Sequence, residues 1–397
     1  MAVTSKSIEQ VAEEAAAGPG PNEEVEERVT PLELFFDLVF VFAITQVTQF
    51  IADDPSWGGM ARGMLILALV WWAWVGYSWL TNWLDTEADR TRLAIFAAMA
   101  AMFVVSLAIP GAFSDDAVVF AFAYAFVRVL HILLFAYASN DVDIVGATKR
   151  FAPAVGLSLA LIFTAAFLDG PAQGVLWALA VLIDFGGALL GGSGWKLHPT
   201  HFAERHGLIV IIAFGESIVA TGLGASETTL TLGVVAAATF GIVIAAALWW
   251  AYFDVVAIVA ERRLKEAPHA EQVSMARDSY SYIHLLLIAG IVLLALGMKK
   301  TIGDIGEPLK TVPAVALCGG VALYLLGHVA FRLRNIGTLN KQRVVVALIA
   351  AVLILPATRL DALVTVALLA VLTAGLITYE AIRFSEARQR IRASVHA

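Results

Sequence analysis

The 397-residue chain has a single cysteine, Cys318, and few charged residues, which make up 15% of the sequence. One cysteine excludes an internal disulfide and a metal site built from several cysteines. Soluble domains contain about 25% charged residues, whereas 60% of this chain is hydrophobic, so a soluble globular protein is excluded. The formal net charge of −7 leaves no basic surface, and we expect no nucleic-acid partner. What remains is a polytopic protein of the lipid bilayer.

Motifs of known enzyme chemistry are also lacking. The sequence has no P-loop, nucleophile elbow or dinucleotide fingerprint, and we therefore expect neither an enzyme nor a cofactor. Three histidines, His198, His201 and His206, lie close together with Glu204 before an apolar run. Their spacing lacks the HExxH pattern that fixes ligand geometry on a helix, so we assign them to an interfacial loop and predict no metal site.

The N-terminal 30 residues contain seven glutamates against Lys6 and Arg28. Such a composition cannot bury a core, so residues 1–30 are predicted to form a disordered acidic tail. A basic segment followed by an apolar one, the pattern of a cleavable signal peptide, is not found before the first apolar run. We therefore interpret that run as a true membrane span.

A helix needs about 20 mostly apolar residues to cross the hydrocarbon layer. Twelve stretches meet this requirement and predict an all-α fold. They are residues 31–51, 60–83, 91–109, 117–137, 151–169, 173–191, 205–224, 229–258, 278–298, 312–331, 343–359 and 362–382.

Lysine and arginine predict the orientation, because cationic loops stay in the cytoplasm. With twelve spans, 20 of these residues fall on the side of both termini and five on the other. Both termini are therefore predicted to be cytoplasmic, and residues 383–397 to form a basic cytoplasmic tail.

Two segments of the chain resemble each other. Trp71-Trp72-Ala73-Trp74 in the second predicted span matches Trp249-Trp250-Ala251-Tyr252 in the eighth. Asp37 lies 34 residues before Trp71, and Glu216 lies 33 before Trp249. We interpret the chain as two six-helix repeats, residues 31–194 and 195–382. An even number of spans per repeat makes them parallel, an arrangement typical of transporters and channels.

Ionisable residues within the spans are candidate functional residues, because charge at bilayer depth is costly and usually faces a cavity or a partner. Glu33 and Asp37 are four residues apart, on one face of a helix. Glu216 lies near mid-membrane among glycines, where burial disfavours its charged form and suits it to proton exchange. Asp37 and Glu216 are the proposed coupling pair, and we expect both to face the region between the first and seventh spans, with Asp37 closer to cytoplasmic water. An alternative register pairs Glu33 with Glu204.

A structural role is the alternative for these acids. Arg128 or Arg205 could form an interhelical salt bridge with Glu33 and Asp37, which together make an acidic stripe on the first span. We expect Arg128 to be the counter-ion of an acid on the first or seventh span, because an unpaired guanidinium in hydrocarbon is costly. His328 occupies the matching position in the second repeat and could serve only when protonated.

Two blocks resemble the bacterial low-temperature-requirement protein A (LtrA) family. The first is Thr30-Pro31-Leu32-Glu33-Leu34-Phe35-Phe36-Asp37, and the second is Glu204-Arg205-His206-Gly207-Leu208 with Phe214-Gly215-Glu216-Ser217. The resemblance implies a multi-pass protein of the bacterial inner membrane, and it brings no particular substrate. The residues that match its motifs are Glu33, Asp37, Glu204, Arg205, Gly215 and Glu216.

A second resemblance is to a lysosomal and bacterial potassium-channel family whose repeats open with Phe-Ser-Asp. Phe36 stands here in the place of the serine. The functions to weigh are thus a proton- or cation-coupled transporter of a small ion or solute, a passive cation channel, and a structural or lipid-interacting protein. The sequence leaves open whether the chain forms a homo-oligomer.

The predicted topology can be tested with reporter fusions. A reporter that is active only in the periplasm should be inactive at the C-terminus and active after the first span, because the cationic side stays in the cytoplasm. Activity at the C-terminus would contradict the orientation.

Overall fold

The computed structural model describes residues 28–138, 142–190, 195 and 197–393. Most of the predicted acidic tail lies outside these residues. The described part is all-helical, which confirms the predicted fold class of a polytopic membrane protein. Its first six helices are α2 (Pro31–Asp53), α3 (Trp57–Thr81), α4 (Asp89–Ala108), α5 (Ala117–Ala138), α6 (Val142–Ala165) and α7 (Pro171–Leu190).

The rest of the described residues form eight α-helices of nine or more residues and four shorter segments, two of them π-helical. These elements are α8 (Pro199–Ser226), α9 (Leu232–Phe253), α10 (Val256–Glu266), α11 (His269–Met275), η1 (Ala276–Ile283), α12 (His284–Gly303), α13 (Thr311–Ala314), η2 (Val315–Gly319), α14 (Gly320–Ile336), α15 (Lys341–Ala357), α16 (Ala362–Arg383) and α17 (Ser385–Ala393).

Each of the twelve predicted spans overlaps one or more helical segments of the described chain. Within the described residues, eleven helical segments are long and apolar enough to cross a membrane. The helix at the place of the eleventh predicted span, α15, has 17 residues and is shorter than the others. About 17 residues is the lower limit for spanning the hydrocarbon.

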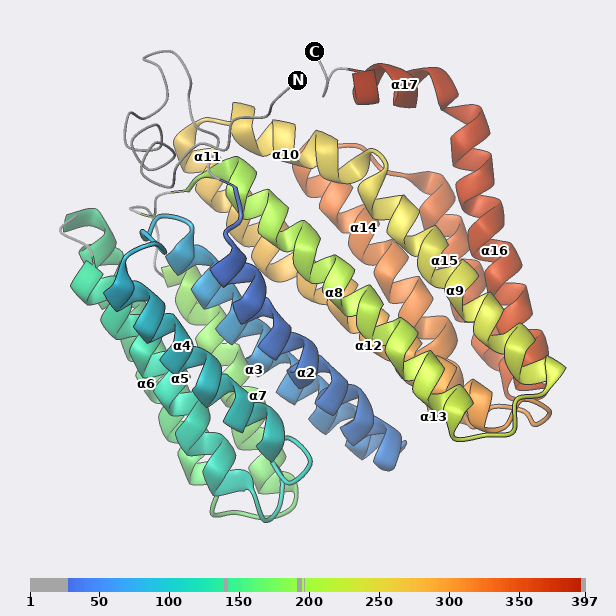
Figure 1. Cartoon of the computed structure of the whole chain (residues 1–397), viewed down its shortest axis with the longest axis horizontal. Helices are drawn as coiled ribbons and strands as arrows, with labels where there is room; N and C mark the ends of the chain where they lie inside the picture. The colour runs from blue at the N-terminus through green and yellow to red at the C-terminus, as the bar shows by residue number, and fades with distance from the viewer. Residues whose placement is uncertain (1–27, 139–141, 191–194, 196, 394–397) are drawn as a thin grey trace, which may run out of the picture.

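The helices form two groups that meet along α2 and α8 (Figure 1). Helices α2 to α7 make up one group, and α8 to α16 make up the other. Helix α12 packs against both α2 and α8. The most buried spans are α3 and the segment that ends in α12. In these two spans, 83% and 78% of an apolar stretch of 18 residues is buried. Helix α2 begins and α16 ends at the same end of the bundle (Figure 1).

Several boundaries differ from those predicted; α6, for example, begins at Val142, nine residues before the predicted start at 151. Helix α8 starts at Pro199, so His201 and Glu204 lie on its first turns and not in a loop. The single span predicted for 229–258 breaks after Phe253, and Asp254 caps the end of α9. There the Asp254 carboxylate pairs with the Arg388 guanidinium of α17 at 2.5 Å. The C-terminal basic segment is thus helical as far as Ala393.

Glycines allow α12 to lie unusually close to η2 and α14. A Cβ added to Gly320 would lie 2.7 Å from both the carbonyl oxygen of Gly290 and the amide nitrogen of Leu294. A Cβ on Gly297 would lie 2.5 Å from the Cα of Leu317. Small residues are what lets membrane helices bring their backbones together.

Substituting Gly320 should therefore destabilise the second group of helices. Gly320→Ala forces backbone atoms apart and should cost about 1–3 kcal/mol, the usual range for overpacking. The adjacent Gly319→Ala is the control, because its Cβ would meet its nearest atom at 3.6 Å, an ordinary contact. Thermal unfolding of both purified variants in detergent is the measurement. Equal unfolding temperatures would contradict the close packing.

Candidate functional site: a buried charge network between α2 and α8

Local sequence fixes the start of α2 and the position of its first acid. Thr30 caps the helix and Pro31 occupies its first turn, where no amide donor is needed. The Thr30 hydroxyl accepts from the Glu33 amide, and the Glu33 carboxylate accepts from the Thr30 amide at 3.0 Å. This reciprocal capping box satisfies two donors at the helix end. It leaves Glu33 fully buried, with 1% of its surface exposed.

Arg205 of α8 joins both acids of α2. Its Nη1 donates to Glu33 Oε1 at 3.1 Å, and its Nη2 donates to Asp37 Oδ1 at 2.6 Å. Because Glu33 and Asp37 are one helical turn apart, they face the same guanidinium. Arg205 and Asp37 have no exposed surface. The structural alternative for the acidic stripe is therefore realised with Arg205, and Asp37 does not lie near water as the sequence suggested.

Helix α3 completes the network from the side. Trp74 Nε1 donates to Asp37 Oδ1 at 2.8 Å, and the Thr81 hydroxyl accepts from Arg205 at 2.5 Å. The Arg205 guanidinium also lies over the Trp74 ring, 5.6 Å from its centroid. Hydrogen bonds to charged groups are stronger than neutral ones, so these contacts offset part of the cost of burying the ions.

His201, which was predicted from the sequence to lie in a loop, is also part of this network. It lies one turn before Arg205 on α8, and its Nε2 contacts Glu33 Oε2 at 2.9 Å. Its Nδ1 lies 3.0 Å from the side-chain amide nitrogen of Asn82. An amide nitrogen only donates, so Nδ1 accepts and the ring proton is on Nε2, directed at Glu33. Within the described residues, no group of three His, Cys, Asp or Glu is placed to hold a metal ion.

Glu204, the other acidic candidate, does not join this network. Its side chain is exposed, and its carboxylate accepts from the Val29 amide at 3.2 Å, which ties the segment before α2 to α8.

Glu216 lies at a second contact between the same two helices. It is buried, with 3% of its surface exposed, and the Thr45 hydroxyl of α2 donates to its carboxylate. The Lys299 ammonium of α12 is close enough to act on it electrostatically and donates to Gln49 of α2. Asp37 and Glu216 thus both face the α2–α8 interface, as the sequence predicted. Asp37 on α2 contacts Arg205 of α8, whereas Glu216, further along α8, contacts Thr45 of α2.

The remaining counter-ion candidates have other partners. Arg128 is buried and paired, but its Nη2 donates to Asp184 of α7 at 2.7 Å and not to an acid of α2 or α8. The prediction of its partner was therefore wrong. His328 Nδ1 lies 3.1 Å from Arg343 Nη1, and Arg343 in turn binds Glu380 at 2.9 Å. Because a guanidinium only donates, His328 is an acceptor here, and Arg343 is the cation that the sequence analysis missed.

Removal of Arg205 should destabilise the protein strongly. Arg205→Gln leaves Glu33 and Asp37 as buried acids without their cation, and breaking such a pair costs about 3–5 kcal/mol. The control is Arg62→Gln, which removes a pair with Asp54 that is more than 40% exposed on both sides. That change should cost about 0–1 kcal/mol. Denaturant unfolding in detergent compares the two, and similar losses would contradict a central role for Arg205.

Comparison with known proteins places the chain in a family. The model of the family "Bacterial low temperature requirement A protein (LtrA)" matches residues 28–378, which include every residue of the network. An uncharacterized protein of Rhizobium meliloti (strain 1021) is 30% identical over 311 residues, covering 74% of this chain and 75% of that protein. The chain belongs to the LtrA family of bacterial membrane proteins.

Proposed function

We propose that this LtrA-family protein is a secondary transporter coupled to protons or another cation, and not an enzyme. The observation that carries the proposal is the environment of Glu216. Its carboxylate is buried at the α2–α8 interface and bound by the Thr45 hydroxyl, and within the described residues it forms no ion pair. A buried carboxylate held by a neutral group can gain and lose a proton without breaking a salt bridge.

Asp37 has a different role in this proposal. Its Oδ1 accepts from Arg205 and Trp74, so protonating the carboxyl would leave the Arg205 cation with Glu33 as its single anionic partner within the network. The Asp37–Arg205 pair is better suited to holding α2 against α8. We therefore assign ion exchange to Glu216 and alignment of the two helices to Asp37, with Glu33 supporting Arg205 from the other side.

Charge on Glu216 is linked to helix packing through Lys299. The ammonium interacts with the Glu216 carboxylate and donates to Gln49 of α2, so three helices meet at this point. Neutralising Glu216 removes its attraction to Lys299 and weakens the junction of α2, α8 and α12. If this junction has two packing arrangements, a local charge change at Glu216 converts into helix movement.

We also propose that the chain is an internal repeat of two parallel units. The Tyr124 hydroxyl donates to the carbonyl of Leu69, and the Tyr324 hydroxyl donates to the carbonyl of Leu248. These bonds join the fourth span to the second and the tenth to the eighth, in each case beside the paired tryptophans. Such correspondence supports the repeat, since unrelated helices have no reason to share it. Location in the inner membrane with both termini cytoplasmic completes the proposal.

Substitution of Glu216 tests the mechanism. Protein reconstituted in liposomes with an internal pH dye should show saturable, gradient-coupled flux with a panel of monovalent cations and small solutes. Glu216→Gln should reduce coupled flux at least tenfold, because the amide keeps the volume and cannot exchange a proton. Asp37→Asn should change affinity more than coupling. Glu227→Gln, at the exposed end of α8, is the matched control and should transport normally.

The same assay separates the other functions. Unchanged coupled flux in Glu216→Gln would reject the carboxylate mechanism. Fast, non-saturating flux would favour a cation channel. No flux with any probe in the intact protein would favour a structural or lipid-interacting role.

A further inference from the structure

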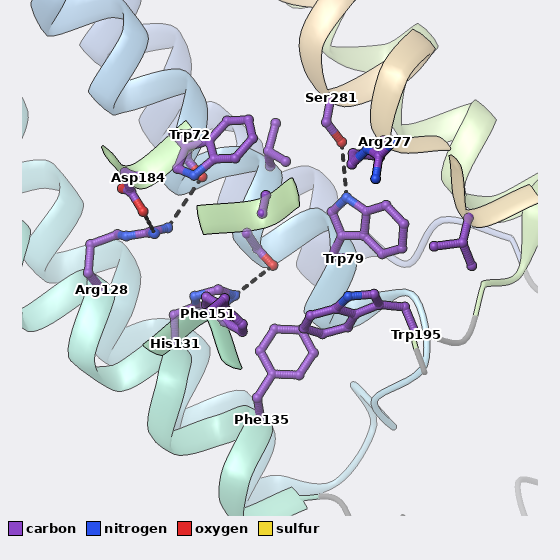
Figure 2. Close-up of a pocket in the computed structure, with 14 residues that line it drawn as sticks. Trp72, Trp79, Arg128, His131, Phe135, Phe151, Asp184, Trp195, Arg277 and Ser281 are labelled. Atoms are coloured by element: carbon purple, nitrogen blue, oxygen red, sulfur yellow. Dashed lines mark hydrogen bonds and ion pairs between the residues drawn. The ribbon is translucent and has the colours of Figure 1, made fainter. Parts of the chain in front are cut away.

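A small cavity lies against α3, on the face of that helix opposite Trp74 and Thr81. Its volume is about 80 Å³, and its walls come from α3, α5, α6 and α7 of the first group and from α11 and η1 of the second. Five of its fourteen lining residues are aromatic: Trp72, Trp79, Phe135, Phe151 and Trp195. Figure 2 shows the Arg128–Asp184 pair on one side of this space and Trp79 with Ser281 on the other.

Three polar side chains in the wall have atoms without a hydrogen-bond partner. Arg128, His131 and Asp184 are each at most 3% exposed. Arg128 Nη2 binds Asp184 Oδ1, but Arg128 Nε and Asp184 Oδ2 are unpartnered, and so is His131 Nδ1. Buried polar atoms are nearly always satisfied, so these three atoms are available to a polar ligand that enters the cavity.

The chemistry of the unpartnered atoms restricts that ligand. His131 Nε2 lies 3.0 Å from the carbonyl oxygen of Gly76 and must donate to it, because a carbonyl only accepts. The neutral ring therefore presents Nδ1 as an acceptor. The cavity thus offers two acceptors, His131 Nδ1 and Asp184 Oδ2, and one donor, Arg128 Nε. A complementary ligand brings at least two donors and one acceptor.

Net charge restricts it further. In the buried wall, the Arg128 cation is neutralised by Asp184, whereas Arg277 at the rim shares Asp278 with Arg334. A ligand without net charge leaves the balance of the buried Arg128–Asp184 pair intact. Arg277 is 28% exposed, so solvent reaches this rim of the cavity. The faces of tryptophan rings attract an ammonium group, which supplies the donors required.

We propose that this cavity binds a small zwitterion of the size of glycine. Its ammonium donates to Asp184 Oδ2 and His131 Nδ1, and its carboxylate accepts from Arg128 Nε. Gly76 keeps the space open, since a Cβ there would lie 2.8 Å from His131 Cε1 and 3.2 Å from Arg128 Nη1. The inference that such a zwitterion is the substrate class of the transporter rests on the proposed function. The inference that the cavity binds it does not.

Binding of radiolabelled glycine to the purified protein in detergent tests the proposal without any gradient. We expect saturable binding that unlabelled glycine displaces. Acetate and methylammonium each carry one half of the zwitterion and should compete at least tenfold more weakly. This comparison uses the unaltered protein, so its result does not depend on the folding of a variant.

Two substitutions on α7 locate the site. Ala188→Leu fills the cavity and should weaken glycine binding at least tenfold. Leu182→Phe adds bulk on the same helix at a side chain that is 67% exposed, and it should leave binding unchanged. Absence of glycine binding, equal competition by acetate or methylammonium, or full binding in Ala188→Leu would each overturn the proposal.

The experiment also separates this proposal from the function. Glycine binding without gradient-coupled flux in liposomes supports the site and rejects coupled transport. Coupled flux of other solutes without glycine binding supports the transporter and overturns the site.

Discussion

The arrangement of the two helix groups depends on the ion pairs that Arg205 of α8 forms with Glu33 and Asp37 of α2. One guanidinium, with no exposed surface, binds carboxylates from two successive turns of α2. Burying three charges is costly, and the pairing compensates that cost only when all partners are present and well oriented. The contact is therefore specific: it sets both the register of α2 against α8 and the orientation of α3, whose Trp74 and Thr81 complete it.

The two sequence blocks that resemble the LtrA family turn out to be two sides of this contact. The first block supplies the capping box and both acids. The second supplies Arg205, and Glu204 of that block holds the segment before α2. Residues about 170 positions apart thus form one structural unit. The family match extends over both blocks, which suits a fold in which neither block can be satisfied without the other.

Much of the fold could be predicted from the sequence, because long apolar runs and turn residues specify membrane helices directly. That Asp37 and Glu216 face the α2–α8 interface could also be predicted, since a lipid-facing charge is unfavourable. Partners could not. Arg128 had several acids within plausible reach, and nothing in its spacing distinguishes Asp184. Arg343 was overlooked because it begins a predicted span, although it reaches inward to Glu380. The start of α8 was missed because its first turns are polar, yet Pro199 is a signal for a helix start.

Helix α3 places the charge network and the cavity next to each other. Trp72, Gly76 and Trp79 recur every three to four residues and face the cavity, while Trp74 and Thr81 lie on the opposite side and contact the network. The two sites are therefore separated by the width of one helix. Trp71 stacks on Trp74 with 5.0 Å between centroids and donates to the carbonyl of Ser281, which lines the cavity. In the proposed transporter, a solute in the cavity acts on α3, and α3 contacts the Arg205 network that aligns α2 with α8, the two helices between which Glu216 exchanges its ion. The coupling is reciprocal: if a shift of these helices lets the solute change the affinity of Glu216 for its ion, the ion changes the affinity for the solute by the same factor.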